Sequence, residues 1–316
     1  MSILENVLPC HVNERVNKNI TLQQIFAKLN FANVNQIANE IINSNLLSKN
    51  IDIKYFWHLL QSHLLYSSNQ NYFVPKLIAL FLHFLIEKDP ILGSRIIKSI
   101  FAEPNLKENF AIMIPFFYYF DYYNIYGRKE IVTLVFKDKS ILSLTYVFIF
   151  YFWFAPILSS DFPKMFEKLT ERIKNERQCP QGFAIFQSHF AEFSDNDWAL
   201  HKQFIESGYF PNTIEAALKT DDLDLLISLL NTTDNQIGMN KYIEPSCLHI
   251  SRYLQQSPTL IQFSAFFGSR KCFSYLFANG ASLDLSRNLT SAHFASAGGC
   301  IDIIHDVNSK CTFSDG

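Results

Sequence analysis

The feature that most limits how this chain can fold is an internal repeat in its carboxy-terminal third. Two segments, starting at Leu260 and Ser291, align when Gly268 is placed on Gly299. The other aligned pairs are Phe263 with Phe294, Ala265 with Ser296, Cys272 with Ile303, and Phe273 with Ile304. Each segment reads as a short helix, a glycine and a second helix with apolar residues at helical spacing. One such unit cannot bury its apolar face alone, so the units are expected to stack on one another.

The repeated residues resemble the ankyrin pattern T-P-L-H-x-A-A-x-x-G-H-x-x-h-V, in which h is apolar. The segment TSAHFASAGGCIDII matches it at Thr290, His293, Ala295, Gly299, Ile303 and Ile304. The turn NGASLD, residues 279–284, is similar to the family's N-G-A-D-x-N. Two positions depart from the pattern, because Ser291 replaces proline and Cys300 replaces the second histidine. The resemblance implies a stack of helix pairs that binds other proteins.

An earlier unit is more divergent. Residues 213–230 keep the two-helix spacing, but Asp221 stands where the family has glycine. Just before it, FIESGYFPN places Gly208 and Asn212 at the family's glycine and asparagine. We therefore expect units at about 198–230, 259–285 and 290–311. Residues 231–258 form an insertion, in which an extra helix near Tyr253 is expected to run into the next repeat.

The resemblance also implies structural roles for several repeat positions. Gly208, Gly268 and Gly299 occupy family glycine positions, and Gly280 is expected to end a second helix in a left-handed conformation. Thr290 is placed to cap the next first helix, its hydroxyl accepting a backbone N–H near His293. His293 itself is interpreted as a hydrogen-bonding repeat position and not as a catalytic residue.

Residues 1–195 are predicted to form a divergent, all-helical domain. Apolar residues recur there every three or four positions, and the whole chain has only 10 Gly and 11 Pro, which favours long helices with short connections. The segment 163–177 is the clearest amphipathic helix. An irregular bundle and a degenerate solenoid both fit, and Ser194 or Asp195 is expected to cap a new helix at the boundary to residues 196–316. This layout is similar to a large group of protist ankyrin-repeat proteins whose helical amino-terminal region has no assigned function. The predicted fold class is all-α: a helical array or bundle followed by a short ankyrin-repeat solenoid.

One stretch, SILSLTYVFIFYFWFAPILSS at 140–160, contains no charged residue. Its length reaches the roughly 20 residues that a transmembrane helix needs. Pro156 is expected to stop or kink the helix, which leaves 141–155, about 22 Å at 1.5 Å per residue and too short for a span. We favour a central buried helix, with a single transmembrane helix as the alternative.

Composition and motifs point away from several classes of function. A net charge of −2 gives no broad positive field for nucleic acid. The six cysteines are scattered without metal-ligand spacing, and neither a phosphate-binding loop nor a nucleophile motif occurs. No enzyme, cofactor or metal is expected. Because the amino terminus has no signal-peptide pattern, free thiols in a reducing cytoplasm are the expectation.

The expected function is therefore a protein-protein interaction scaffold or adaptor, and the alternative is a membrane-anchored ankyrin-repeat protein. Binding residues are expected at the turn tips, as the resemblance implies: Tyr209, Phe210, Pro211, Ser282, Leu283, Leu285, Ser286 and Arg287. Phe210 and Leu283 have a second interpretation, packing between adjacent turns. The sequence ends without a polar closing repeat. Three explanations stay open: the last helix pair leaves its apolar face open, another molecule covers that face, or the sequence is a truncated gene product. The identity of the partners stays open.

Overall fold

The computed structural model describes residues 10–66, 74–102, 110–137, 144–175, 190–231, 238–284 except 245, 250 and 252, and 289–311. Over these residues helices are the regular secondary structure, and an isolated β-bridge pairs Tyr242 with Thr259. The all-α prediction is confirmed for this part of the chain.

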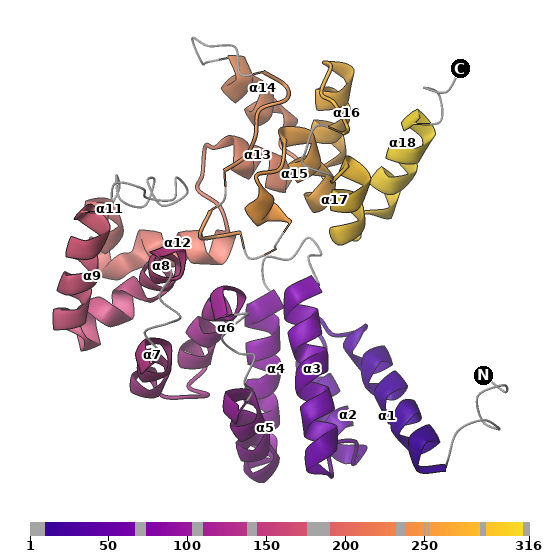
Figure 1. The fold of residues 1–316 in the computed structure, drawn as a ribbon, viewed down its shortest axis with the longest axis vertical. Coiled ribbons are helices and arrows are strands. Elements are labelled where there is room, and N and C mark those ends of the chain that lie inside the picture. Colours follow the sequence, from indigo (N-terminus) through magenta and orange to yellow (C-terminus); the bar gives the residue numbers. More distant parts are fainter. Residues whose placement is uncertain are drawn as a thin grey trace. The chain divides into compact units, whose positions relative to one another are not determined.

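The helices fall into two compact units, which Figure 1 colours along the chain. The first unit contains α1 (Cys10–Phe26), α2 (Val34–Asn43), α3 (Asn50–Tyr66), α4 (Val74–Lys88), α5 (Pro90–Ala102), α6 (Phe110–Tyr122) and α7 (Arg128–Lys137). The second contains α8 (Leu144–Asp161), α9 (Pro163–Asn175), α11 (Phe190–Ser194), η3 (Asn196–Trp198), α12 (Ala199–Ser207), α13 (Ile214–Thr220), α14 (Leu223–Asn231), η4 (Leu254–Gln256), α15 (Leu260–Phe267), α16 (Arg270–Ala278), α17 (Ser291–Ala297) and α18 (Ile301–Cys311).

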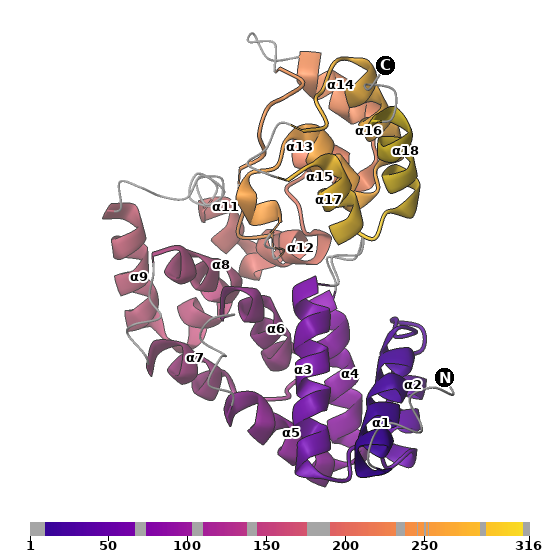
Figure 2. The ribbon, with the colours of Figure 1, turned by 45° about the vertical axis from the view of Figure 1, so that its right-hand side comes forward.

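The first unit is built around α4, which packs against α2, α5 and α6 (Figure 2). Its core is aromatic: the ring of Phe81 meets that of Phe26 edge to face at 5.4 Å, and Trp57 stacks on Phe116 at 5.9 Å. All four side chains are buried. Aromatic pairs of this kind add about 0.5–1.5 kcal/mol each beyond the area they bury.

The connection between α4 and α5 shows how the sequence defines a sharp boundary. Asp89 accepts the backbone N–H of Leu92 at 2.9 Å, and Pro90 occupies the first position of α5, where its missing N–H costs nothing. Gly93 lies so close to α4 that a Cβ atom would sit 2.6 Å from Cγ1 of Ile86. The two helices therefore pack closely because of that glycine.

Helix α8 is the central element of the second unit and continues through Pro156 to Asp161. The sequence predicts that Pro156 stops or kinks this helix. The helix does not stop there, so that part of the prediction is wrong. Proline has no N–H, so the carbonyl of Phe152, four residues earlier, loses its helical partner. The Nε2 of His201 lies 2.6 Å from that carbonyl, fully buried. A residue of α12 thus replaces the hydrogen bond that Pro156 removes.

From Val147 to Leu158 nearly every side chain of α8 is buried, which agrees with a central buried helix. Among the helices that the structure describes, none is both long enough and apolar enough to cross a membrane. Helix α9 begins at Pro163 and buries Leu169 and Ile173, as its pattern predicts.

The division between the two units does not fall near residue 195, where the sequence predicts it. It falls before α8, because α8 and α9 group with the helix pairs that follow them. The insertion explains this grouping. The indole Nε1 of Trp153 in α8 donates to the carbonyl of Cys247 at 3.1 Å. The expected extra helix does not run into the next repeat: in the described part of the insertion the helical segment is η4, and a left-handed Ser257 separates it from α15. The insertion therefore joins the repeats to α8.

Three helix pairs follow one another in the second unit: α13 with α14, α15 with α16, and α17 with α18. Helix α15 packs between α13 and α17, and Figure 1 shows the three side by side in chain order. A left-handed residue precedes each second helix by two positions: Asp221, Gly268 and Gly299. In each turn, the backbone N–H of the residue after the left-handed residue donates to the carbonyl five residues earlier in the chain, at 2.8–2.9 Å. The same helix-ending geometry therefore recurs three times.

Adjacent pairs are also tied by hydrogen bonds at these turns. The carboxylate of Asp221 accepts the backbone N–H groups of Lys271 and Cys272, at 3.2 and 3.0 Å, at the start of α16. The hydroxyl of Ser269 donates to the carbonyl of Leu218 in the preceding pair. The two contacts of Asp221 thus satisfy free N–H groups at the start of α16 with a side chain from the preceding helix pair.

Candidate functional site

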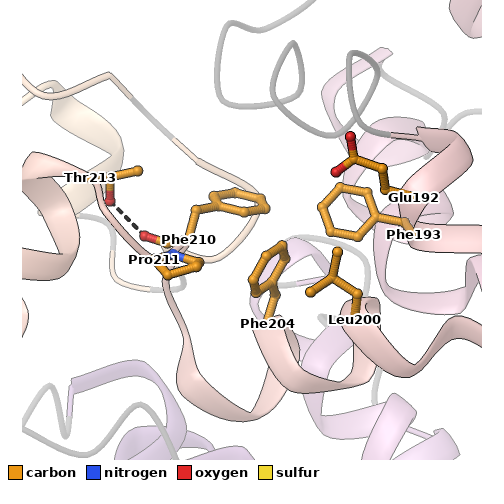
Figure 3. Close-up of a pocket in the computed structure, with 7 residues that line it drawn as sticks. All are labelled: Glu192, Phe193, Leu200, Phe204, Phe210, Pro211 and Thr213. Atoms are coloured by element: carbon orange, nitrogen blue, oxygen red, sulfur yellow. Dashed lines mark hydrogen bonds between the residues drawn. The ribbon is translucent and has the colours of Figure 1, made fainter.

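A pocket of about 220 Å³ lies in the second unit where α11, α12 and the turn before α13 meet (Figure 3). Its apolar wall consists of Phe193, Leu200, Phe204, Phe210 and Pro211. Figure 3 shows the three phenylalanine rings around one space. This is the candidate site, and it contains two of the predicted turn-tip residues.

The aromatic wall is held by ring contacts. Phe204 meets Phe193 edge to face at 5.1 Å and Phe210 at 4.9 Å. The rings of Phe193 and Phe210 are 6.1 Å apart. All three side chains are at least nine-tenths buried, so the wall is rigid and preformed.

The turn that carries Phe210 is built by local sequence signals. Helix α12 ends at Gly208 with φ 75°, and Asn212 has φ 57°. The hydroxyl of Thr213 donates to the carbonyl of Phe210 at 2.7 Å and accepts the backbone N–H of Ala216 at 3.1 Å. One threonine therefore both caps α13 and fixes the turn.

An unusual turn precedes α12, the helix that carries Leu200 and Phe204. Asn196, Asp197 and Trp198 all have positive φ, between 49° and 61°. The sequence predicts that Ser194 or Asp195 caps a new helix here. Asp195 is the N-cap residue of η3, although its side chain makes no capping hydrogen bond, and the residue before α12 is Trp198. Left-handed backbone costs non-glycine residues about 1–2 kcal/mol each. The burial of Trp198 against Phe190, with ring centres 5.7 Å apart, offsets part of that cost.

Two polar residues complete the lining, Glu192 and Thr213. Glu192 is exposed and is the charged residue among those that line the pocket in the described part of the chain. The lining of the site therefore combines an apolar wall with one acidic residue and one hydroxyl.

The predicted turn-tip residues have different environments. Phe210 is 5% exposed and Leu283 is 9% exposed, so both pack within the fold, the second interpretation of their positions. Pro211 is exposed, and Tyr209 and Ser282 are half-buried. Leu285, Ser286 and Arg287 lie outside the described residues.

The predicted structural positions have the backbone geometry that their residue types favour. Gly208, Gly268, Gly280 and Gly299 have φ of 75°, 71°, 88° and 68°. Thr290 and His293 form a capping box at the start of α17. The Thr290 N–H donates to Nδ1 of His293 at 3.1 Å, so the histidine side chain takes part in the cap, in addition to the backbone N–H that the sequence indicates.

A second group of polar residues is buried beside α13. The Nε2 of His249 lies 3.3 Å from the carboxylate of Glu215, and Lys219 donates to the carbonyl of Gly208. Burial lowers the pKa of His249, which Glu215 partly opposes. Burial also lowers the pKa of Lys219 to about 8. Burial is the largest single influence on the pKa of Glu215 and raises it, but His249 and Lys219 together outweigh burial, so the net shift is downward. A neutral histidine beside a carboxylate ties the insertion to α13.

Sequence reasoning missed Glu192, Phe193, Leu200 and Phe204, which line the pocket. It also missed His201 and His249. The roles of the two histidines depend on contacts with residues far along the chain, and no short motif surrounds either histidine. The apolar spacing of α12 could have indicated that Phe204 is buried, but not what it faces.

The described residues offer little for metal or thiol chemistry. Within them, no group of three or more His, Cys, Asp and Glu side chains could hold a metal ion. Cys247, Cys272 and Cys300 are buried and present as thiols, not as disulfides. Burial raises the pKa of Cys247, and burial and the charge of Asp221 raise the pKa of Cys272 to about 12, so both stay protonated.

Comparison with known proteins adds no relative to this description. No family model matches the chain, and no curated protein or solved structure matches it either. The resemblance to ankyrin repeats therefore depends on the quoted residues alone, and a function has to be inferred from the side chains of this chain.

Proposed function

We propose that the protein is a non-catalytic scaffold or adaptor that binds other proteins through a short stack of ankyrin repeats. The observation that carries this proposal is the threefold recurrence of one geometry. Each helix pair has a threonine at the start of its first helix and a left-handed residue before its second. Such recurrence is typical of solenoids, whose stacked units present extended surfaces to partners.

The threonines support the proposal in detail. Thr213 and Thr259 accept the backbone N–H three residues on, at 3.1 and 3.4 Å, and Gln262 returns the contact by accepting the Thr259 N–H at 3.0 Å. Each helix pair is thus bounded by local hydrogen bonds. Its exposed turns are then held in place, so a partner that binds them meets little ordering cost.

The proposed absence of catalysis is supported by the environment of the candidate groups. His249 is fully buried against Glu215, and burial keeps the thiols of Cys247 and Cys272 protonated. A general base or nucleophile must reach its substrate, and these side chains face the interior. We also propose the cytoplasm as the compartment, because Cys247, Cys272 and Cys300 are thiols and not disulfides.

The experiment that tests the proposal starts with capture of partners from cell extract on the purified full chain. Each captured protein is then purified and titrated against the chain by calorimetry, with hydrogen exchange to locate the contact. We expect protection of exposed residues of the second unit around residues 207–213. Pro211→Glu is expected to weaken binding by at least about tenfold, that is 1.4 kcal/mol.

A matched control is Ile91→Glu, because Ile91, at 77% exposure, is the most exposed of the described large apolar residues of the first unit. This variant should bind with unchanged affinity. If Ile91→Glu abolishes binding while Pro211→Glu has no effect, the repeats are not the binding surface. If no captured protein binds the purified chain, the scaffold proposal fails.

A further inference from the structure

The insertion places one histidine side chain in the interior of the second unit. The imidazole of His249 is fully buried, and both of its ring nitrogens are closed to solvent. Its Nε2 lies 3.3 Å from the carboxylate of Glu215 in α13, and its ring centre lies 5.3 Å from that of Phe263 in α15. The imidazole is therefore enclosed by helices of two adjacent pairs.

This environment suits the neutral form of the imidazole. Water cannot solvate a charged ring there, so desolvation disfavours the imidazolium. Among the described residues, the charged groups that act on it are Glu215, which favours the proton, and Lys219, which opposes it. Lys219 is held in α13 by its hydrogen bond to the carbonyl of Gly208, and Cys247 in the insertion stays a neutral thiol. Burial is the largest effect and lowers the pKa of His249.

The segment that carries His249 is closed on itself. Its ends are joined by a hydrogen bond from the N–H of Ile243 to the carbonyl of Pro258, at 2.7 Å. Between these ends, the side-chain amide of Gln255 donates to the carbonyls of Ser246 and His249. The segment can therefore leave the helices as one body while its ends stay fixed, which is a local opening and not an unfolding of the unit.

We propose that the described residues 246–249 and 253–257 form a proton-sensitive clamp: when the imidazole of His249 takes up a proton, the clamp leaves α13 and α15 while the helix pairs stay folded. In the released clamp water solvates the imidazolium, so proton uptake and release favour each other. Release uncovers the face of α15 that carries Phe263. It also separates the carbonyl of Cys247 from the indole of Trp153 and exposes the buried thiol of Cys247.

The direction of the pH dependence follows from the two states of His249. The ring has its ordinary pKa of about 6.5 in the released clamp and a lower pKa in the closed clamp. The closed clamp is therefore fully stable above about pH 6.5 and loses stability as the pH falls. The released population should rise about eightfold between pH 7 and pH 5.5. Glu215 and Lys219 keep their charges over this range, because the pKa of Glu215 is lowered and that of Lys219 is about 8.

The test measures how fast dithiodipyridine, a disulfide reagent that reacts at acidic as well as neutral pH, labels the cysteines of the full chain. Each rate is divided by that of the same cysteine in the urea-unfolded chain at the same pH, so the effect of pH on thiol chemistry cancels. We expect Cys247 to react faster than Cys272 and Cys300, which stay buried when the clamp alone opens. The relative rate of Cys247 should rise about eightfold between pH 7 and pH 5.5.

Three variants assign the effect to one contact. His249→Gln keeps an amide that can donate to Glu215 but takes up no proton, so labelling of Cys247 should be the same at both pH values. Glu215→Gln removes the carboxylate that favours the imidazolium, so the rise should be at least as large as in the wild type. His305→Gln removes an exposed histidine of α18 and should behave like the wild type.

Several results would overturn the clamp. Equal relative rates for Cys247, Cys272 and Cys300 would mean that the chain opens only as a whole. A rate of Cys247 that is independent of pH, or a rise that persists in His249→Gln, would remove the role of the imidazole. If His249→Gln does not fold, a rise in Glu215→Gln smaller than that of the wild type decides against the clamp.

Discussion

Two buried helices of the second unit, α8 and α15, are held in place by different kinds of hydrogen bond. Helix α15 is bounded by neighbours in the sequence: Thr259 and Gln262 cap its start, and Gly268 ends it. Helix α8 depends on distant residues, since the hydrogen bond to His201 spans 49 residues and that to Cys247 spans 94. The comparison separates structure that local residues determine from structure that only the folded chain provides.

This difference has an energetic consequence. A lost local cap removes one hydrogen bond at a helix end, where neighbouring residues can adjust, at a cost of about 0.5–2 kcal/mol. A lost distant donor leaves a buried carbonyl without a partner in the middle of α8. Its full desolvation cost then applies, about 1–3 kcal/mol, in addition to any cavity. The distant contacts of α8 are therefore expected to be the more sensitive.

The largest effect is expected for His201→Ala. It removes the donor to the Phe152 carbonyl and opens a cavity among Phe152, Phe193 and Trp198, whose rings surround His201. We expect a loss of about 3 kcal/mol in unfolding free energy, measured by urea denaturation. His201→Gln, whose amide can donate to the same carbonyl, should recover at least half of the loss. Equal losses in both variants would show that the hydrogen bond contributes nothing.

The second effect is a dependence of stability on pH. Burial lowers the pKa of His201 from 6.5 to about 4, an effect that the hydrogen bond to Phe152 partly opposes. The unfolded chain therefore binds a proton that the folded chain does not, and stability is complete above pH 6.5 and falls toward pH 4. We expect a loss of about 2 kcal/mol from this group between pH 7 and pH 5.

The measurement compares urea unfolding of the wild type and of His201→Gln at both pH values. The neutral variant should lose less stability on acidification, by about 2 kcal/mol. Burial also lowers the pKa of His249, so a residual dependence of the same sign is expected in the variant. An identical pH dependence in the two proteins would contradict the assignment to His201.

A smaller effect is expected when a local cap of α15 is removed. Thr259→Val keeps the shape of the buried side chain but removes the oxygen that accepts the Gln262 N–H. We expect a loss of about 1.5 kcal/mol and faster hydrogen exchange in the first turn of α15. Ser274→Ala on the exposed face of α16 is the control and should stay within about 0.5 kcal/mol. A loss above that of His201→Ala would reverse the comparison between α15 and α8.

A backbone effect is expected at the end of α16. Gly280 has φ 88°, and a Cβ atom added to it would meet no other atom within 4 Å, so Gly280→Ala costs only conformational strain, about 1 kcal/mol. Gly238 is equally open but has no positive φ. Gly238→Ala should therefore be neutral or stabilise by up to about 1 kcal/mol. Melting temperatures of the two variants that shift in the same direction would contradict this explanation.

The comparison of α8 and α15 also shows how far the sequence allowed prediction. The cap at Thr290 and the left-handed conformation of Gly280 could be predicted because each acts within a few residues of its own helix. The course of α8 could not, because nothing near Pro156 indicates that His201 completes its hydrogen bonding.

The grouping of α8 with the repeats and the pocket at Phe210 have the same origin. Both depend on contacts between segments that the insertion and the turns bring together. Trp153 reaches Cys247 in the insertion, and Phe193 in α11 meets Phe210 in a turn. Apolar spacing indicates that such residues are buried, but it does not indicate their partners.

The smallest net effect is expected at Asp221, where a local and a distant role oppose each other. Its φ of 53° favours glycine, and Asp221→Gly would relieve about 1 kcal/mol of strain. The same change removes the carboxylate that accepts the N–H groups of Lys271 and Cys272, which costs about as much. We therefore expect unfolding free energy to change by less than about 0.5 kcal/mol, while hydrogen exchange at the start of α16 becomes faster.

Asp221→Asn keeps an acceptor and tolerates the left-handed backbone, so it should protect α16 nearly as well as the wild type. Slower exchange in Asp221→Gly than in Asp221→Asn would mean that the backbone of Asp221, and not its side chain, orders the next helix pair.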